Sequence, residues 1–395
     1  MNEMIRVYYG RAMASAIGGE HGLSDEALDG LAAQVGGIVE QIEAERAEGK
    51  RPYRELPYDE SMVQAVEAAC AVRRGKYDNL VVLGIGGSAL GNIALQTALN
   101  GPMYNLLPDR QRRGPRLFVM DNVDPVQFAA LLDMVEPHLE RTCFNVISKS
   151  GQTVETASQF LIVRELLRRR LGADGARDRI IVTTDPTSGP LRQIVEAEGY
   201  DALPVPPGVG GRFSVLSPVG LFSAAMCGID IRQLLAGAAA MDLRVRNRRL
   251  RQNPAAIIAA VHYLLMQRGK RMHVMMPYSY QLKDLADWYR QLWAESLAKR
   301  TTLDGSEVLA GPTPIRALGA TDQHSQVQLY LDGPNDKVIT IVAVEHFDRD
   351  VQIPRDLEDL EAICYLGGST MARLMEAERQ ATEQALAASG RPLLT

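Results

Sequence analysis

Cysteine is scarce in this chain of 395 residues, which contains four. No two of them form a CxxC pair, and each lies in an apolar stretch of sequence. This pattern indicates free, buried thiols in a reducing compartment and argues against a disulfide-stapled secreted scaffold. We therefore expect a cytoplasmic protein in which the following residues are unpaired: Cys70, Cys143, Cys227 and Cys364.

Long apolar runs and basic clusters are also missing. No 18 consecutive residues are apolar, so we expect no membrane-spanning helix, and the opening MNEMIRVYYG lacks the apolar core of a secretory signal peptide. The net charge is −5 and no basic block occurs, so we expect neither nucleic acid nor membrane as a partner. A small anionic substrate is still compatible with a locally positive pocket.

What the sequence does contain is an alternation of apolar, strand-like runs with helical patterns. The runs are almost continuously apolar, which is typical of parallel strands covered on both faces. The alternation predicts a doubly wound α/β layer. The predicted strands are 79–85, 116–122, 141–148 and 178–184, and the predicted helices are 92–100, 124–135 and 153–171.

The same alternation returns in the second half of the chain. We predict a strand at 271–279, a helix from about Lys283 to Arg300, and further strands at VQLYLD (327–332) and KVITIVAV (337–344). The fold class is therefore α/β, with two doubly wound parallel sheets and N-terminal helices. The predicted segments are an N-terminal helical segment (1–50), a first domain (51–215), a helical bridge (216–240) and a second domain (241–395).

The first candidate motif is GIGGSALG, residues 84–91, where a predicted strand enters a glycine turn. Glycine lets backbone N–H groups come close to a ligand, and a helix that starts after such a turn favours an anion. The dinucleotide pattern G-x-G-x-x-G has an acidic residue about 20 residues later, whereas here the spacing after the second glycine is longer and the acidic residue Asp121 comes late, in a different pattern. A phosphate of another kind and a purely structural turn remain open.

The second motif, SKSGQTVET, also joins a predicted strand to a helix start. Hydroxyls, backbone amides and one ammonium group suit a phosphate monoester, and the residues that supply them are Ser148, Lys149, Ser150 and Thr153. The alternative is an ordinary Ser/Thr helix cap beside a solvated lysine. Two such turns at the carboxyl edge of one sheet favour a shared ligand crevice.

Three further residues could take part in proton or charge transfer. Arg212, in GVGGRFS, lies among glycines and could face a developing negative charge, or it could brace the loop. His324 lies in a polar turn, where an imidazole can move a proton near pH 7, or it could be an ordinary exposed histidine. His324 is not spaced from other histidine, cysteine or acidic residues as a metal ligand would be, so we expect no metal. Glu295 could act as a general base.

Glu295 is four residues after Gln291, so both side chains occupy one face of the predicted helix. A carboxylate in this tryptophan-containing helix would be partly shielded from water, which suits a general base. The alternative is a solvated i,i+4 ion pair between Glu295 and Lys299.

Taken in order, these motifs resemble the glucose-6-phosphate isomerase family in its shorter bacterial form. The resemblance runs from about residue 50 to the C-terminus, and GGRFS and Q-x-x-x-E-S are its most specific parts. It implies two sugar-isomerase (SIS) domains, a homodimer, and the interconversion of glucose 6-phosphate and fructose 6-phosphate in glycolysis and gluconeogenesis. This chemistry needs no redox cofactor and no metal.

The resemblance also implies a role for each matching residue. Ser148, Lys149, Ser150 and Thr153 would hold the sugar phosphate, with Gly87 and Ser88 beside the sugar. Glu295 would carry a proton between C1 and C2 through a cis-enediolate that Arg212 stabilises. Gln291 would hold sugar hydroxyls. His324, from the partner subunit, would help to open the pyranose ring.

Two departures from the family pattern stand out. The phosphate loop reads Ser150-Gly151-Gln152, where the family usually has threonine and further hydroxyls. Family members also carry a lysine near the C-terminus, whereas the last lysine here is Lys337 and nothing after Arg373 resembles that segment. We therefore expect the chain to end before it.

The alternatives are a non-catalytic sugar-phosphate-binding SIS module, an SIS transferase, an isomerase of a related substrate such as mannose 6-phosphate and, more remotely, a nicotinamide enzyme. A pure binding module has no need of Glu295, Arg212 and His324 together, so these three residues separate the isomerase from the module.

Overall fold

The computed structural model describes residues 5–395, which form two compact units. The central unit is Glu40–Arg246, and the outer unit combines Met1–Val39, described from Ile5 onward, with Asn247–Thr395. These units differ from the predicted segments. Residues 1–50 are divided between the two, and 216–240 belong to the central unit because the helix at Pro218–Met226 packs against other helices there.

The central unit contains a five-stranded parallel sheet in the order β2-β1-β3-β4-β5. Each strand that we predicted is present, and its bounds lie within two residues of the expected ones. The strands are β1 (Asn79–Leu83), β2 (Arg116–Met120), β3 (Thr142–Ile147), β4 (Ile180–Thr184) and β5 (Asp201–Pro204).

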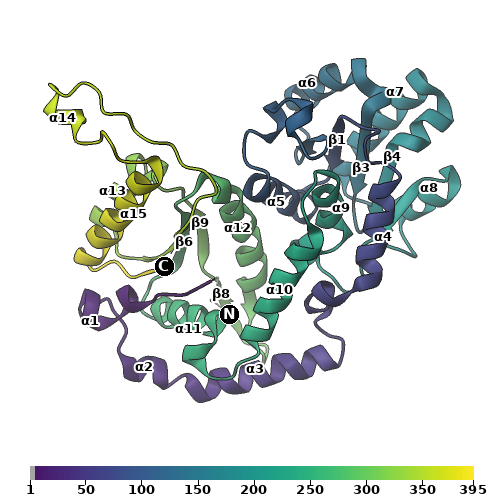
Figure 1. Cartoon of the computed structure of the whole chain (residues 1–395). Helices are drawn as coiled ribbons and strands as arrows, with labels where there is room; N and C mark the ends of the chain where they lie inside the picture. Colours follow the sequence, from purple (N-terminus) through teal and green to yellow (C-terminus); the bar gives the residue numbers. More distant parts are fainter. Residues whose placement is uncertain (1–4) are drawn as a thin grey trace. The chain divides into compact units, whose positions relative to one another are not determined.

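Helices cover both faces of this sheet (Figure 1). Alternate residues of β1 enter different hydrophobic clusters: Leu80 and Val82 pack in one, Val81 and Leu83 in the other. This confirms the doubly wound layer. The helices are α4 (Glu60–Ala71), α5 (Leu90–Leu99), α6 (Pro125–Val135), α7 (Val154–Arg179), α8 (Pro190–Glu198), α9 (Pro218–Met226) and α10 (Ile231–Val245).

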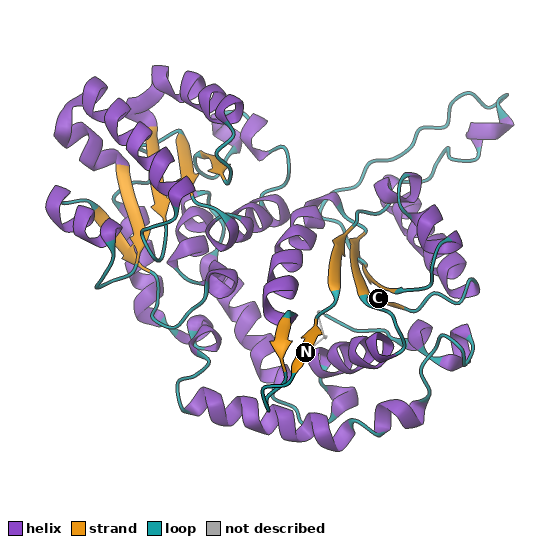
Figure 2. Cartoon of the chain, turned by 180° about the vertical axis from the view of Figure 1, so that it is seen from behind, coloured by secondary structure: helices purple, strands orange, loops and turns teal. Residues whose placement is uncertain are grey.

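The outer unit contains a second parallel sheet, in the order β11-β10-β6-β9, and a small antiparallel hairpin (Figure 2). Val338 and Ile339 of β10 pack into different clusters, so this sheet is also covered on both faces. The strands are β6 (Met272–Pro277), β7 (Lys299–Thr301), β8 (Glu307–Ala310), β9 (Thr313–Arg316), β10 (Lys337–Val342) and β11 (Leu393–Leu394).

The outer unit takes its helices from both ends of the chain, with α1 near the N-terminus and α15 near the C-terminus (Figure 1). They are α1 (Ala14–Ile17), α2 (Asp25–Asp29), α11 (Pro254–Gln267), α12 (Lys283–Leu297), α13 (Val327–Asp332), α14 (Glu361–Cys364) and α15 (Met371–Ala388). Helix α3 (Ala32–Ala47) runs from the outer unit into the central one.

The prediction of a strand at VQLYLD is wrong, because these residues form helix α13. Their alternating apolar pattern fits a strand, but the buried side chains are Val327 and Tyr330, which are three residues apart. Leu329 is 57% exposed, whereas a strand with this pattern would bury it together with Val327. The segment thus buries one stripe of a short helix.

The glycine turn after β1 lies against the backbone of another turn. A Cβ on Gly87 would lie 2.3 Å from the carbonyl carbon and oxygen of Gly211 and 2.8 Å from the amide nitrogen of Arg212. No side chain fits in that space. Gly87 therefore allows the turn after β1 and the turn 208–214 to touch at the carboxyl edge of the sheet.

We predict that Gly87→Ala will lower the free energy of unfolding of the central unit by about 1–3 kcal/mol, because backbone atoms must move to admit the methyl group. Urea denaturation measures the change. The matched control is Gly237→Ala in α10, where a Cβ would meet nothing within 4 Å. Helix propensity should make that variant more stable by about 0.5–1 kcal/mol. Equal stability of the two variants would contradict the close approach.

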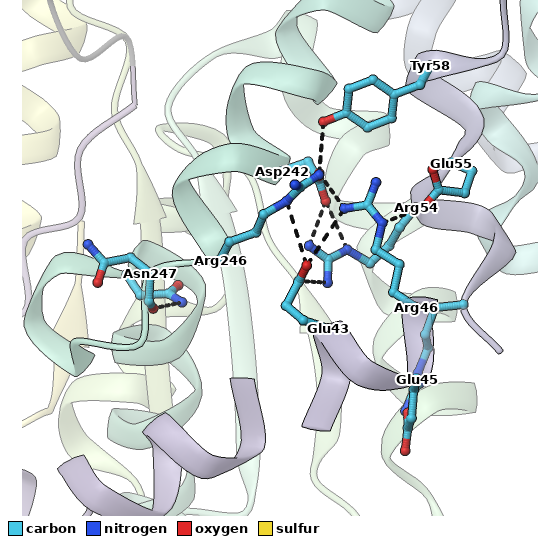
Figure 3. A network of polar contacts seen from close by, with 11 residues as sticks. Glu43, Glu45, Arg46, Arg54, Glu55, Tyr58, Asp242, Arg246 and Asn247 are labelled. Atoms are coloured by element: carbon cyan, nitrogen blue, oxygen red, sulfur yellow. Dashed lines mark hydrogen bonds and ion pairs between the residues drawn. The ribbon is translucent and has the colours of Figure 1, made fainter. Parts of the chain in front are cut away.

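Within the central unit, an ion-pair network ties α10 to the end of α3 and to the segment that follows it (Figure 3). The Asp242 carboxylate, 8% exposed, accepts hydrogen bonds from Arg46 (2.8 Å), Arg54 (2.7 Å), Arg246 (2.5 Å) and the Tyr58 hydroxyl (2.9 Å). Burial acts to raise the pKa of Asp242, but the hydrogen bonds, led by that from Arg246, outweigh it and hold this pKa far below its usual value.

We predict that Asp242→Asn will lower the free energy of unfolding of the central unit by about 3 kcal/mol near pH 7, because buried guanidinium groups lose their counter-charge. Since the folded-state pKa is lowered, the stabilisation is complete above about pH 5 and is lost progressively as pH falls through the unfolded value of about 3.9. Urea denaturation of both proteins at several pH values tests this.

The control is Glu60→Gln, which removes an exposed partner of Arg232 and should leave stability nearly unchanged. A stability difference between wild type and Asp242→Asn that stays constant from pH 7 to pH 3 would contradict the assignment.

Candidate active site

The order of the central sheet marks one edge as a ligand site. In a 2-1-3-4-5 sheet the chain winds in opposite directions from β1 and β3, and a crevice opens at their carboxyl ends. The glycine turn follows β1, and SKSGQT follows β3. The two turns singled out in the sequence therefore flank the switch point of this sheet.

Ser148 organises the turn after β3 from inside. Its side chain is 3% exposed, and its hydroxyl pairs with the Thr153 hydroxyl at 3.0 Å and accepts from the Gly151 amide at 3.1 Å. Ser150, by contrast, is exposed, and its hydroxyl accepts from the Gln152 amide at 3.2 Å. Within this turn Ser148 shapes the loop, and Ser150 presents a hydroxyl to the outside.

The turn ends at the N-terminus of α7, whose helical course is broken at Gly172. Thr153 occupies the cap position, but in the described structure no side chain caps the helix, because the Thr153 hydroxyl pairs with Ser148 instead. The first amides of the helix therefore keep their donor capacity, and the helix dipole adds partial positive charge. This arrangement suits an anion such as a phosphate group.

Lys149 links this turn to the turn that carries Arg212. Its Nζ donates to the carbonyl oxygen of Val209 at 2.9 Å. The Arg212 guanidinium lies over the ring of Phe213, with 4.7 Å from Cζ to the ring centroid, and Tyr53 stacks on Phe213 at 4.6 Å. Two cationic side chains are thus held close to the carboxyl edge of the sheet.

The glycine turn completes this group. Gly86–Ser88 form a short 3-10 helix whose middle residue touches Gly211 and Arg212. The close approach that the sequence required is therefore made to another turn of the same unit, and the turn positions Arg212. The half-buried Gly87 and Ser88 lie beside Arg212, which is compatible with the predicted wall of a sugar site.

In the outer unit, α12 places Gln291 and Glu295 together. The Gln291 Nε2 donates to a Glu295 carboxylate oxygen at 3.0 Å, as their spacing of four predicts. Glu295 is exposed, so the tryptophan of its own helix does not shield its side chain from water, contrary to the expectation from the sequence. The Lys299 Nζ donates to the carbonyl oxygen of Ser296 at 2.6 Å.

His324 ends a short 3-10 helix, Thr321–His324, and its side chain is exposed. The residue before it is anchored inwards: the Gln323 amide donates to the Tyr278 hydroxyl at 2.9 Å and to the Thr382 hydroxyl at 2.6 Å. This anchor fixes the turn while the imidazole faces outwards, as the prediction of an accessible proton carrier requires.

Sequence reasoning overlooked two aromatic residues. Phe213 and Tyr53 form the stack under Arg212, and neither was considered as part of the site. Phe213 carried a signal, because an aromatic residue directly after a candidate arginine can support the guanidinium face. Tyr53 is 160 residues away in the chain and carried none.

The remaining chemistry of the described residues is sparse. Within residues 5–395 no three histidine, cysteine or acidic side chains gather as a metal site, and none of the helices there is long and apolar enough to cross a membrane. The four cysteines are free. Burial raises the pKa of Cys70, Cys143 and Cys227 to about 12, so these thiols stay protonated.

Known proteins are similar to this chain in both sequence and fold. The sequence profile of the family described as Phosphoglucose isomerase matches residues 61–362. A glucose-6-phosphate isomerase of Carboxydothermus hydrogenoformans is 46% identical over 374 residues, which are 94% of this chain and 80% of that protein. One of Rubrobacter xylanophilus is 48% identical over 337 residues, 85% of this chain and 75% of that protein.

Among solved structures, a hypothetical protein of Thermus thermophilus superposes with a TM-score of 0.84 at 35% identity, covering 99% of this chain and 87% of that one. A glucose-6-phosphate isomerase of Chlamydia trachomatis shares the fold, with a TM-score of 0.72 at 24% identity over 86% of this chain and 64% of that one. The matched profile covers most of the chain, and the relatives match along most of their own length. The chain belongs to the phosphoglucose isomerase family.

Proposed function

We propose that this chain interconverts glucose 6-phosphate and fructose 6-phosphate by moving a proton between C1 and C2 through a cis-enediolate. Its family membership supports this aldose–ketose isomerase activity, which serves glycolysis and gluconeogenesis. The observation that carries the proposal is the pair of joined turns at the β1/β3 edge, where Lys149 bonds to the turn that holds Arg212.

The phosphate group of the substrate would bind at the turn after β3. Ser150, Thr153 and the first amides of α7 offer donors, and Lys149 adds positive charge. Ser148 would act mainly by holding the turn in shape, because its hydroxyl is already engaged there. Gly87 and Ser88 would border the sugar.

The isomerisation itself would use one carboxylate and one guanidinium group. Glu295 would remove the proton from C2 of the open-chain aldose and return a proton to C1, with Gln291 fixing the carboxylate and the sugar hydroxyls. The negative charge that develops on the enediolate oxygens would be stabilised by Arg212, whose position is fixed by Phe213.

Two alternative functions predict different behaviour toward hexose phosphates. A non-catalytic sugar-phosphate-binding module would bind hexose phosphates without converting them. An isomerase of mannose 6-phosphate would use the same enediolate, because glucose and mannose differ only at C2, and comparing turnover of the two aldoses separates them. We also propose a cytoplasmic location, which the scarcity of cysteine and the absence of CxxC pairs in the sequence support.

We predict that Glu295→Gln will lower kcat for fructose 6-phosphate formation by about 10²–10⁴-fold, because the amide cannot accept the C2 proton. KM should change little, since the phosphate donors remain. The matched control is Glu307→Gln, an exposed carboxylate of β8 that pairs with Arg300 and should keep wild-type kcat. If Glu295→Gln keeps most of the wild-type activity, the base assignment is wrong.

We further propose a homodimer in which His324 of one subunit serves the site of the other. This predicts that Glu295→Gln and His324→Ala, each impaired alone, complement each other when the two chains are co-expressed. A mixed dimer would contain one site with both Glu295 and His324 intact, so random pairing should restore about a quarter of wild-type sites.

A matched control for complementation is the pair Glu295→Gln with Arg212→Gln, because both residues are proposed to act from one chain on the same site. Every site of that mixed dimer would lack one of the two residues, so this mixture should stay impaired. Restored activity with Arg212→Gln, or no restored activity with His324→Ala, would contradict the proposed exchange of His324.

A further inference from the structure

Three aromatic side chains that the proposed mechanism does not use lie together where α11, β6 and α12 meet. His262 of α11 and His273 of β6 are buried, with 3% and 2% of their surfaces exposed. Their ring centroids are 4.3 Å apart in an edge-to-face arrangement, and the Trp293 ring lies 5.4 Å from that of His273. These rings join one strand and two helices of the outer unit.

The hydrogen bonds in this cluster assign the proton on each imidazole. His262 Nδ1 lies 2.9 Å from the carbonyl oxygen of Ile258, so it must be the protonated nitrogen. The Trp293 Nε1 donates to His273 Nδ1 at 2.9 Å, so that nitrogen carries a lone pair. Burial lowers the pKa of His273 to about 3 and that of His262 to about 4, which keeps both rings neutral.

His273 therefore has one feature that an apolar residue or an imidazole protonated at Nδ1 would lack: an acceptor aimed at the indole N–H. Its other nitrogen is buried and makes no hydrogen bond to the described residues. The bond to Trp293 is thus the polar contact that β6 offers to α12 through this side chain.

The position of Trp293 on α12 explains how this hydrogen bond could affect Gln291 and Glu295. Each residue of an α-helix is turned by about 100° from the one before it. Trp293 lies two residues from both Gln291 and Glu295, so it projects from the opposite face of α12 to these two. A bond that fixes Trp293 against the sheet therefore fixes the direction in which the Gln291–Glu295 pair points.

We propose that His273 is a positioning residue: its hydrogen bond from Trp293 sets the rotation of α12 and so aims the Glu295 carboxylate. This inference rests on the proposed function of Glu295. The bond fixes the base without touching the substrate, so its loss should affect the proton-transfer step more than phosphate binding, whose donors lie in the central unit.

Two substitutions of His273 in the full chain test the acceptor. His273→Leu removes it, whereas His273→Asn places an amide oxygen close to the position of Nδ1. We expect His273→Leu to lower kcat about tenfold with KM within about twofold of wild type, and His273→Asn to recover kcat to within about threefold. Both are assayed with glucose 6-phosphate at a temperature where circular dichroism shows the variant to be folded.

A double-mutant cycle separates this bond from general packing. Trp293→Phe keeps an aromatic ring and removes the N–H donor. If the bond carries the effect, Trp293→Phe lowers kcat to a similar extent, and the double variant His273→Leu/Trp293→Phe is no slower than either single variant. Effects on kcat that multiply would show independent packing contributions and would overturn the proposal.

The indole N–H offers a direct signature, because the chain has only two tryptophans. With ¹⁵N-labelled tryptophan, the indole resonance that disappears in Trp293→Phe belongs to Trp293. That resonance should move in His273→Leu and stay near its wild-type position in His273→Asn. An unmoved resonance in His273→Leu would overturn the hydrogen bond.

The outcomes distinguish this inference from the proposed function. Loss of activity in Glu295→Gln together with wild-type kcat in folded His273→Leu would overturn the positioning role alone. Retained activity in Glu295→Gln would remove the base assignment whatever His273 does. If His273→Leu fails to fold, Trp293→Phe decides: an unchanged kcat overturns the proposal.

Discussion

The close contact between two backbone turns is the constraint on which the candidate site depends. Gly87 has no space for a side chain because the Gly211–Arg212 peptide occupies it. This contact joins the turn after β1 to the turn that carries Arg212, and Lys149 joins the turn after β3 to the same segment. The three turns thus contact one another at the carboxyl edge of the central sheet.

The two units contribute different kinds of chemistry. The central unit offers helix amides, hydroxyls and two cationic side chains, which suit the binding of a phosphate and the stabilisation of negative charge. The outer unit offers a carboxylate, its amide partner and an exposed imidazole. These are the groups for proton transfer. The rings of His262, His273 and Trp293 extend this division, because in our proposal they would orient the base without joining the reaction.

The sequence predicted much of this fold because its parallel strands are buried on both faces. β1, β3 and β4 are mostly apolar and are buried along their whole length, which is the pattern of a parallel strand covered on both faces. VQLYLD was assigned wrongly because six residues can satisfy a strand pattern and a helix pattern at once, and only packing decides. The fold class was confirmed, whereas the compact units followed packing that crosses distant segments.

Within the candidate site, the geometry was predictable where a local sequence pattern determines it. Turns that follow strands and the i,i+4 spacing of Gln291 and Glu295 are visible in the sequence, and the contact between those two side chains is present. The partners that support the site were not visible. Tyr53 under Phe213 and His273 against Trp293 meet only after the chain folds, and neither pair has a spacing that a helix or strand would impose.

The most direct test of the account follows the proton itself. Fructose 6-phosphate is converted in D₂O, and the glucose 6-phosphate formed is analysed by proton NMR. Proton transfer through an enediolate by an exposed carboxylate predicts solvent deuterium at C2 in part or all of the product. If glucose 6-phosphate forms up to equilibrium with no deuterium at C2, a direct hydride shift is indicated and the account is contradicted.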